Sequence, residues 1–133
     1  MKIHQNSTFQ NILDQFSILF PYLKLEIYGK SHKDEEGSKS EDQLSHLTLL
    51  SEINPSLSEK EFNLDHEMSV SDFEKMIENE LSLHVQVFRK SNSIWLQTTA
   101  TDHWSLKKQN KKGQNSTIDY KIEPIDITDF DVE

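Results

Sequence analysis

The sequence predicts an α+β fold, a two-layer sandwich in which an antiparallel sheet of about four strands carries two long helices on one face. Apolar residues recur at helical spacing over residues 9–20 and 70–81, and each run is followed at once by strand-like alternation, over 23–28 and 83–87. A second candidate strand follows in each half, and a short helix closes the order. This order equals a ferredoxin-like fold whose first strand has moved to the end, with the expected strand order third, fourth, second, first.

The first helix has a predicted start and a predicted end. Ser7 and Gln10 have the spacing of a capping box, in which the serine hydroxyl covers free backbone donors and the glutamine side chain reaches back. Pro21 ends the helical run, because proline does not continue a helix. Residues 23–28 then alternate as a half-buried strand.

The middle of the chain is less regular. Residues 29–43 contain almost nothing that can be buried, and we expect a mobile, charged loop. Residues 44–53 are apolar enough to pack, but their spacing fits a short helix and a strand equally. After the turn at Asn54-Pro55, residues 61–65 are predicted as a short strand.

The second half has clearer signals than the first. Ser69 is the expected N-cap of its long helix, with Asp72 at the third helical position. The strand over 83–87 is expected to turn at residues 91–93 and to return over 94–100 as its hairpin partner.

The two halves match at the apolar positions of their helices, at an offset of 61 residues. The matches are Phe9 with Val70, Ile12 with Phe73, Phe16 with Ile77 and Phe20 with Leu81. Their strands match at an offset of 60 residues. Any two amphipathic helix–strand pairs would match in part, so duplication and chance stay equally open.

The chain is expected to form one domain over residues 1–113. Thr101 or Asp102 is the expected cap of a short helix that ends at Gly113, since glycine suits a helix end. Residues 114–133 are rich in acids and are expected to form an acidic tail or an edge strand.

Composition limits the partners and the compartment. The chain has 133 residues, a formal net charge of −9 and no cysteine. Its negative charge opposes general binding to nucleic acid or to anionic membranes, which needs clustered Lys and Arg. The lack of cysteine excludes disulfides and thiolate sites and fits a reducing cytoplasm. No apolar segment approaches the ~20 residues that span a bilayer, and residues 1–10 lack a signal-peptide pattern, so a cytoplasmic protein is expected.

The sequence contains no familiar catalytic or metal-binding pattern. Its six histidines are not spaced to place two imidazoles on one helix or strand face, so no metal or other cofactor is expected. Asp102, His103 and Ser105 form the best catalytic set, but adjacency in sequence seldom supplies the geometry of a triad. The favoured interpretation makes Asp102 a helix cap and His103 a surface residue. No catalytic residue is therefore assigned, and an enzyme is not favoured.

One cluster of positive charge is present. It consists of Lys107, Lys108, Lys111 and Lys112. With Trp104 beside it, this cluster would suit a nucleic-acid backbone and stacked bases. The alternative is a solvated helix end, where lysines also favour the helix dipole. The net charge makes nucleic acid the less favoured partner.

Residues 84–110 contain the side chains best suited to recognition. Both tryptophans and the only arginine lie in this stretch, and these residue types often anchor binding surfaces. The alternation along its strand allows Trp95 to face either the helices or solvent. The predicted binding surface comprises Arg89, Trp95, Thr99, Asp102, His103 and Trp104.

A pattern of VFRKS, then W-L, then TT-x-T-D-x-W runs over residues 87–104. With this pattern, residues 68–110 resemble a family of small bacterial proteins of unknown function. The resemblance implies a bacterial cytosolic protein, and it carries no activity and no catalytic residue.

These observations favour a non-enzymatic protein-binding or regulatory module that uses the surface of residues 84–110. Its expected partner is another protein, or a second copy of the chain paired through the edge of the hairpin. The alternative is a small-molecule-binding domain, or a minor enzyme with a site near Asp102 and His103.

Overall fold

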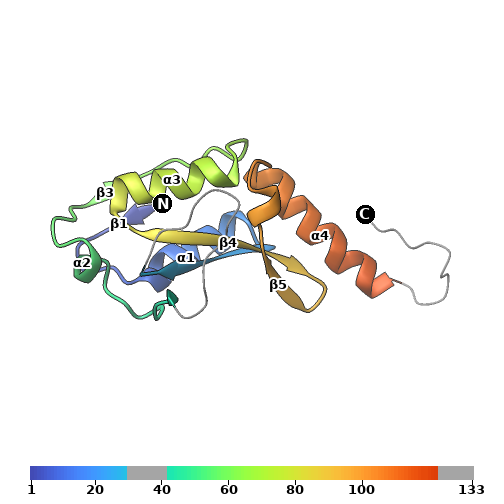
Figure 1. Cartoon of the computed structure of the whole chain (residues 1–133), viewed down its shortest axis with the longest axis horizontal. Helices are drawn as coiled ribbons and strands as arrows, with labels where there is room; N and C mark the ends of the chain where they lie inside the picture. Colours follow the sequence, from blue (N-terminus) through green and yellow to red (C-terminus); the bar gives the residue numbers. More distant parts are fainter. Residues whose placement is uncertain (30–41, 123–133) are drawn as a thin grey trace.

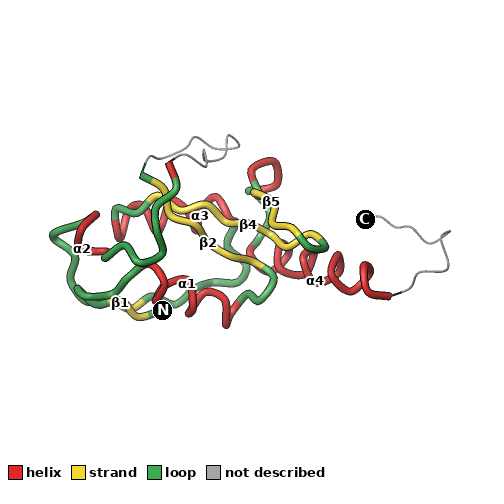
Figure 2. The backbone as a smooth tube through the Cα atoms, turned by 90° about the horizontal axis from the view of Figure 1, so that it is seen from below, coloured by secondary structure: helices red, strands yellow, loops and turns green. Residues whose placement is uncertain are grey.

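The computed structural model describes the backbone of residues 1–29 and 42–122, and the side chains of these residues up to 117. This part of the chain is an α+β structure with two antiparallel sheets and four α-helices (Figures 1 and 2). Its elements are β1 (Lys2–Ile3), α1 (Phe9–Leu19), β2 (Leu23–Tyr28), α2 (Leu50–Ile53), β3 (Lys60–Glu61), α3 (Val70–Leu81), β4 (His84–Ser91), β5 (Ile94–Gln97), a 3-10 helix (Thr99–Thr101) and α4 (Leu106–Ile122).

The larger sheet has the strand order β2–β4–β5, and both strand pairs are antiparallel. β2 pairs with β4 along its whole length, from Leu23 opposite Arg89 to Tyr28 opposite His84. β5 pairs only with the second half of β4, as the predicted hairpin. The turn between them includes Asn92 at a φ of 56°, a left-handed conformation that asparagine tolerates well.

The structure differs from the predicted four-stranded, permuted ferredoxin-like sheet. The strand expected over 61–65 is reduced to β3, which pairs with β1 in a separate two-stranded sheet. β2, the first predicted strand, therefore lies next to β4, the third predicted strand, and not next to the second, which was expected over 61–65. The partner of β3 comes from the amino terminus, where the buried Ile3 joins the hydrophobic core and brings β1 with it.

Beyond the end of β5, hydrogen bonds with Glu74 and Thr98 replace strand pairing at the edge of β4. The Val87 N–H donates to Oε2 of Glu74 in α3 at 2.9 Å. The Val87 carbonyl accepts from the N–H and the hydroxyl of Thr98, at 3.2 and 2.9 Å. Glu74 and Thr98 are both buried. Because a buried backbone group without a partner costs about 1–3 kcal/mol, these contacts allow the sheet to end here without a fourth strand.

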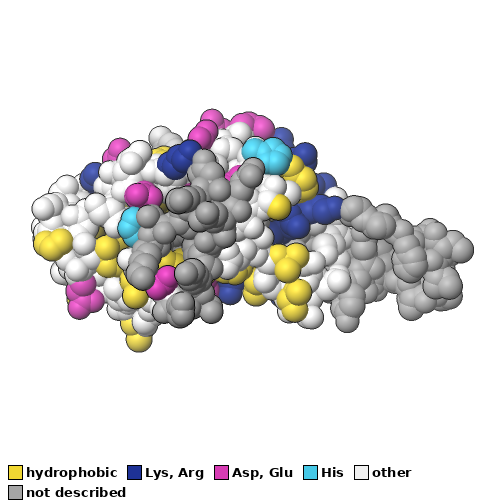
Figure 3. All heavy atoms as spheres, viewed as in Figure 1, with side chains coloured by type: hydrophobic (Ala, Val, Ile, Leu, Met, Phe, Trp, Pro, Cys, Tyr) yellow, Lys and Arg dark blue, Asp and Glu magenta, His cyan; other side chains and the backbone are white. Residues whose placement is uncertain are grey.

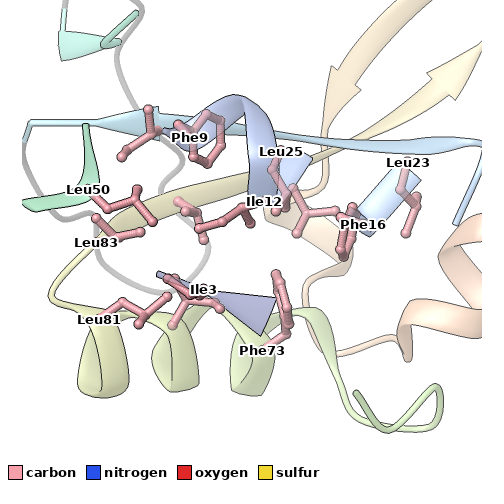
Figure 4. Packing of buried hydrophobic residues seen from close by; sticks show 14 of the residues in the cluster. Ile3, Phe9, Ile12, Phe16, Leu23, Leu25, Leu50, Phe73, Leu81 and Leu83 are labelled. Atoms are coloured by element: carbon pink, nitrogen blue, oxygen red, sulfur yellow. The ribbon is translucent and has the colours of Figure 1, made fainter. Parts of the chain in front are cut away.

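α1 and α3, which correspond to the two predicted long helices, pack on the same face of the larger sheet, as predicted. Phe16 of α1 and Phe73 of α3 are fully buried, and their ring centroids lie 5.2 Å apart. Figure 4 shows the two rings together with Leu23 and Leu25 of β2. Each buried phenylalanine contributes about 1.5–3 kcal/mol to folding, so this contact is a main attachment between the two halves.

Backbone hydrogen bonds join the two helix starts of the first half. The Phe9 N–H at the start of α1 donates to the Thr48 carbonyl at 3.0 Å. The Leu50 N–H at the start of α2 donates to the Ser7 carbonyl at 2.9 Å. First-turn N–H groups have no acceptor inside their own helix, so the two helix starts supply each other's missing acceptors.

The second half repeats this reciprocal contact between helix starts. The Val70 N–H at the start of α3 donates to the Trp104 carbonyl at 3.0 Å, and the Leu106 N–H at the start of α4 donates to the Met68 carbonyl at 2.9 Å. Phe9 and Val70 are matched positions of the predicted repeat. The same contact at matched positions supports duplication of a helix–strand–helix unit.

The caps of the long helices follow the predictions in part. The N-cap of α1 is Thr8, whose N–H donates to Oδ1 of Asn11 at 2.8 Å, so the box lies one residue later than predicted. The Ser7 hydroxyl instead accepts a hydrogen bond from the backbone N–H of His4. The N-cap of α3 is Ser69, as predicted, and its hydroxyl accepts from the Asp72 N–H at 3.0 Å.

The last helix begins later and ends later than predicted. α4 runs over Leu106–Ile122, so the edge strand expected within 114–133 is helical up to residue 122. The Ser105 hydroxyl accepts from the Lys108 N–H at 3.0 Å and serves as the cap. Gly113, expected to end the helix, lies inside α4.

Three further predictions fall on less regular segments. The stretch 44–53, whose type was open, ends in the short helix α2. Most of the predicted loop 29–43 and the last part of the predicted tail fall on residues 30–41 and 123–133, which lie outside the described residues.

We predict that Phe16→Ala and Phe73→Ala each lower the free energy of unfolding by about 3–5 kcal/mol, because each leaves a cavity in the core. The loss in the double variant should fall short of the sum by about 0.5–1.5 kcal/mol, the size of a direct ring–ring interaction. Urea unfolding followed by circular dichroism measures these values. Ile18→Ala, at a position 79% exposed on α1, is the control and should change stability by less than about 0.5 kcal/mol. Strict additivity of the two phenylalanine variants would contradict the contact.

Candidate binding surface

The β4–β5 hairpin divides the predicted surface residues between its two faces. Val85 and Val87 of β4 lie in the core beneath the helices, so Arg89 shares the helix side by alternation. Trp95 pairs with Lys90 in the ladder, and cross-strand partners lie on the same face. Trp95 is therefore half-buried on the side of the sheet away from the helices, which answers the question that the sequence left open.

Trp104 lies on the helix side, in the turn that leads into α4. Its half-buried ring has Nζ of Lys108 at 4.2 Å and Cζ of Arg89 at 5.8 Å from the ring centroid. Both distances fall within the range of cation–π contacts. The structure thus brings Arg89 and Trp104 together and leaves Trp95 on the other face.

A hydrogen-bond chain holds the Arg89 guanidinium in place. Nη1 of Arg89 donates to Oε1 of Gln109 at 2.8 Å. Nε2 of Gln109 donates to the carbonyl and the hydroxyl of Thr101, both at 2.8 Å. Gln109 is fully buried, so its own position is set by packing. The guanidinium is therefore positioned beside Trp104 before any ligand binds.

A groove of about 620 Å³ runs along the first half of α4, and we call it the α4 groove. It is lined by Glu67, Trp104, Ser105, Lys107, Lys108, Lys111, Lys112 and Asn115. Figure 3 shows basic side chains gathered over the beginning of α4. The one carboxylate in the lining, Glu67, has Oε2 at 3.5 Å from Nζ of Lys107, and such an exposed pair contributes little. The groove therefore presents an aromatic ring among lysines, an arrangement suited to an anionic ligand with an apolar part.

The lysine cluster and its neighbouring tryptophan were visible in the sequence as one basic stretch. The sequence did not indicate that Glu67, 40 residues before Lys107, completes the lining. It also gave no sign that Gln109 is the residue that positions Arg89. The local sequence around a polar residue in a basic helix does not show whether that residue is buried or exposed.

Gly113 allows α4 to approach the sheet closely. A Cβ at this position would lie 2.9 Å from Cβ of Tyr22, 3.0 Å from the Tyr22 carbonyl oxygen and 3.2 Å from Cγ of Arg89. The Tyr22 N–H donates to Oδ1 of Asn110 at 2.8 Å, which joins the start of β2 to the same helix. The glycine is thus required by close packing of α4 and not by the helix end that the sequence suggested.

The other predicted surface residues do not gather into one site. Thr99 is half-buried in the 3-10 helix, Asp102 is buried and His103 is exposed. The backbone carbonyl of Asp102 accepts from the Ser71 N–H at 2.8 Å. The helix cap expected at Asp102 is supplied by Ser105. Because Asp102 is buried while His103 is exposed, the pair does not present two adjacent groups to a substrate.

The opposite face of the sheet contains a buried carboxylate that the sequence analysis missed. Glu26 is only 4% exposed. Its Oε1 accepts from Nε2 of Gln43 at 2.9 Å and lies 2.6 Å from Nε2 of His46, while its Oε2 lies 3.2 Å from Nζ of Lys24. These partners compensate the buried charge and join residues 43–46 to β2. Gln43 and His46 come from a segment without a regular pattern, so the sequence did not indicate these two partners.

Trp95 has two lysines beside its ring. Nζ of Lys24 lies 5.3 Å and Nζ of Lys90 lies 5.0 Å from the ring centroid. Lys24 also lies 5.3 Å from the ring centroid of Phe88. These cation–π contacts join all three strands of the sheet and account for Trp95 by intramolecular packing.

The described part of the chain has neither a candidate metal site nor a membrane-spanning helix, and comparisons with known proteins find no match. Within residues 1–29 and 42–122, no group of three or more His, Asp or Glu side chains is placed to hold a metal ion. In the same part of the chain, no helix has the length and apolar character needed to cross a bilayer. Comparisons with protein-family models, curated proteins and solved structures find nothing that matches this chain.

We predict that Gly113→Ala destabilises the protein by about 1–3 kcal/mol through overpacking against Tyr22. Helix propensity alone would give the opposite sign, because alanine is favoured over glycine in a helix by about 1 kcal/mol. Thermal and urea unfolding of the variant measure the change. Asn115→Ala, at an exposed position of the same helix, is the control and should be neutral or slightly stabilising. A stabilised Gly113→Ala would contradict the close approach of α4.

Burial raises the pKa of Tyr28 to about 12, and the nearby charge of Glu26 adds to this effect. In the unfolded chain the pKa of tyrosine is about 10. The folded state holds the phenolic proton more tightly than the unfolded chain does. The resulting stabilisation of the folded state is complete below about pH 10 and is lost as the pH rises towards about 12. We predict that the free energy of unfolding falls over this window by up to about 2–3 kcal/mol. Urea unfolding at pH 8, 10 and 11 should show this fall in the natural protein and a smaller one in Tyr28→Phe. Equal falls in both proteins would refute the assignment.

Proposed function

We propose that this protein is a non-enzymatic binding module whose α4 groove binds a short acidic segment of a partner protein. The observation that carries the proposal is the gathering of Trp104 and four lysines in one groove, on a chain with a net charge of −9. In a strongly acidic protein, four lysines gathered beside an aromatic ring form a local basic surface that suits an acidic ligand with an apolar part.

Comparison of the two halves supports the choice of this site. Both halves contain a long helix, a strand and the reciprocal contact between helix starts. The first half ends in the four-residue α2, whereas the second half ends in the 17-residue α4. The position of Trp104 in that contact is held by Thr48 in the first half. The groove is thus an addition to a framework that forms without it, as expected when a functional site is built on a repeated unit.

The charges favour a short ligand. The lysine ammonium groups attract carboxylates, and the Trp104 ring offers apolar area to a neighbouring side chain. A long polyanion such as nucleic acid would extend beyond the groove and be repelled by the acidic side chains on the rest of the surface. Repulsion over more than the Debye length of about 8–10 Å is screened, so a short acidic peptide confined to the groove is less affected.

The absence of cysteine and the resemblance of residues 68–110 support a bacterial and cytoplasmic setting for such a module. The alternative, a small-molecule or catalytic site at Asp102 and His103, has less support because Asp102 is buried.

Fluorescence polarisation with a defined probe tests the proposal. The probe is a fluorescein-labelled decapeptide made of glutamates with two central leucines. We expect a Kd of about 10–100 μM at 50 mM NaCl, weakening as salt rises because surface charges are screened. Trp104→Ala should weaken binding at least about fivefold, which corresponds to about 1 kcal/mol. Lys108→Gln should weaken it by about threefold, since one exposed charge is removed.

Lys2→Gln, on β1 at the opposite end of the molecule from α4 (Figure 1), is the matched charge control and should bind as the natural protein does. Competition with a single-stranded oligonucleotide separates the two anion classes. An oligonucleotide that binds the groove more tightly than the peptide would assign it to nucleic acid. Undiminished binding by a folded Trp104→Ala would exclude the groove as the site.

A further inference from the structure

Among the described residues, no strand pairs with the outer edge of β5, and this edge forms a second surface, independent of the α4 groove. β5 is the last strand in the order β2–β4–β5. Soluble proteins usually protect edge strands with charged side chains, proline or a bulge. The edge Ile94–Gln97 has none of these, and its ladder with β4 is continuous. Residues 91–101 contain no charged side chain at all, in a chain of which 28% of residues are charged.

Hairpin geometry determines which backbone groups of β5 face outward. The closing pair of a two-residue hairpin, here Ser91 with Ile94, is hydrogen-bonded, and the bonding alternates along the ladder. Lys90 and Trp95 therefore form a non-hydrogen-bonded pair. Accordingly, the Lys90 N–H donates away from β5, to the Tyr22 carbonyl at 2.9 Å. The N–H and carbonyl of Trp95 thus point to the free edge of the sheet.

The side chains of β5 add exposed apolar area at the same place. Ile94 is 57% exposed and Leu96 is 38% exposed. Both lie on the helix side of the sheet, where α4 packs mainly on β4 and to a lesser extent on β2. Covering such side chains contributes about 25 cal/mol for each Å² removed from water.

We propose that two copies of this protein pair through their β5 strands, antiparallel, about a two-fold axis at Trp95. The outward N–H of Trp95 then donates to the Trp95 carbonyl of the second copy, and the reverse bond forms by symmetry. Ile94 of each copy lies opposite Leu96 of the other, so all four exposed aliphatic side chains are covered. The two three-stranded sheets become one sheet of six strands.

The position of the axis follows from the side chains. The other outward-facing backbone position in β5 is Gln97, since it is two residues from Trp95. An axis at Gln97 would place Leu96 opposite Thr98, which is buried and bonded to Val87 within its own subunit. Only the axis at Trp95 pairs both exposed aliphatic residues.

The interface is small. Four residues per strand and four aliphatic side chains bury less than the roughly 1,200–2,000 Å² of a stable interface. The dimer is therefore reversible, with a Kd on the order of 100 μM.

Sedimentation equilibrium of the full chain over about 5–500 μM, a range that brackets the expected Kd, tests the association. We expect a monomer–dimer equilibrium that Leu96→Lys weakens at least tenfold, because a charge is placed in the apolar pair. Leu47→Lys, which adds the same charge at a position 78% exposed outside β5, is the control and should leave the equilibrium unchanged. A monomer at every concentration, or a dimer that Leu96→Lys does not weaken, would overturn the proposal.

Single-cysteine variants test the register, because the chain has no cysteine of its own. Hydrogen-bonded antiparallel partners have Cα atoms about 5.5 Å apart, within the range of disulfides. Under mild oxidation, Trp95→Cys should form a covalent dimer faster than Gln97→Cys, while Leu47→Cys should stay monomeric. Faster crosslinking of Gln97→Cys would overturn the axis. None of these residues lines the α4 groove, so peptide binding by the same variants reports separately on the proposed function.

Discussion

The reciprocal hydrogen bonds between helix starts are the constraint on which the rest of this structure depends. In each half, an N–H from the first turn of one helix donates to a carbonyl just before the other helix. The contact places α1 beside α2 and α3 beside α4, although long stretches of chain separate them. In the second half one of these carbonyls belongs to Trp104. The backbone bond that orients α4 therefore also places the ring of the α4 groove.

The position of α4 explains how an acidic protein maintains a basic surface. Gly113 lets the helix lie close to Tyr22 and Arg89, and Gln109 holds the Arg89 guanidinium beside Trp104. Lys107, Lys108 and Lys111 are exposed and project from a helix whose buried side is occupied by uncharged residues. The charge of the groove arises from four residues within six positions, so it does not depend on the net charge of the chain.

Among the described residues, the backbone groups along the β5 side of the larger sheet find hydrogen-bond partners in one part, and no strand pairs with the other part. Glu74 and Thr98 satisfy the backbone of Val87 where β5 has ended, which closes that part of the β4 edge from within the protein. β5 has no such cover among the described residues, and its exposed side chains are apolar. The part of the β4 edge beyond β5 is thus closed from within the protein, whereas the described residues provide no strand partner for the outer edge of β5.

The sequence by itself determined the local elements: both long helices, the strands that follow them, the hairpin, the cap at Ser69 and the basic stretch beside Trp104. These depend on periodicity, capping and turn chemistry, which act between residues close in the chain. Only the tertiary structure decided that β2 pairs with β4, that β3 pairs with β1, that α4 passes through Gly113, and that Trp95 and Trp104 lie on opposite sides of the sheet. Strand pairing and close helix packing depend on contacts between distant residues, and Glu74, Gln109 and Gly113 acquire their roles only from partners that local patterns do not contain.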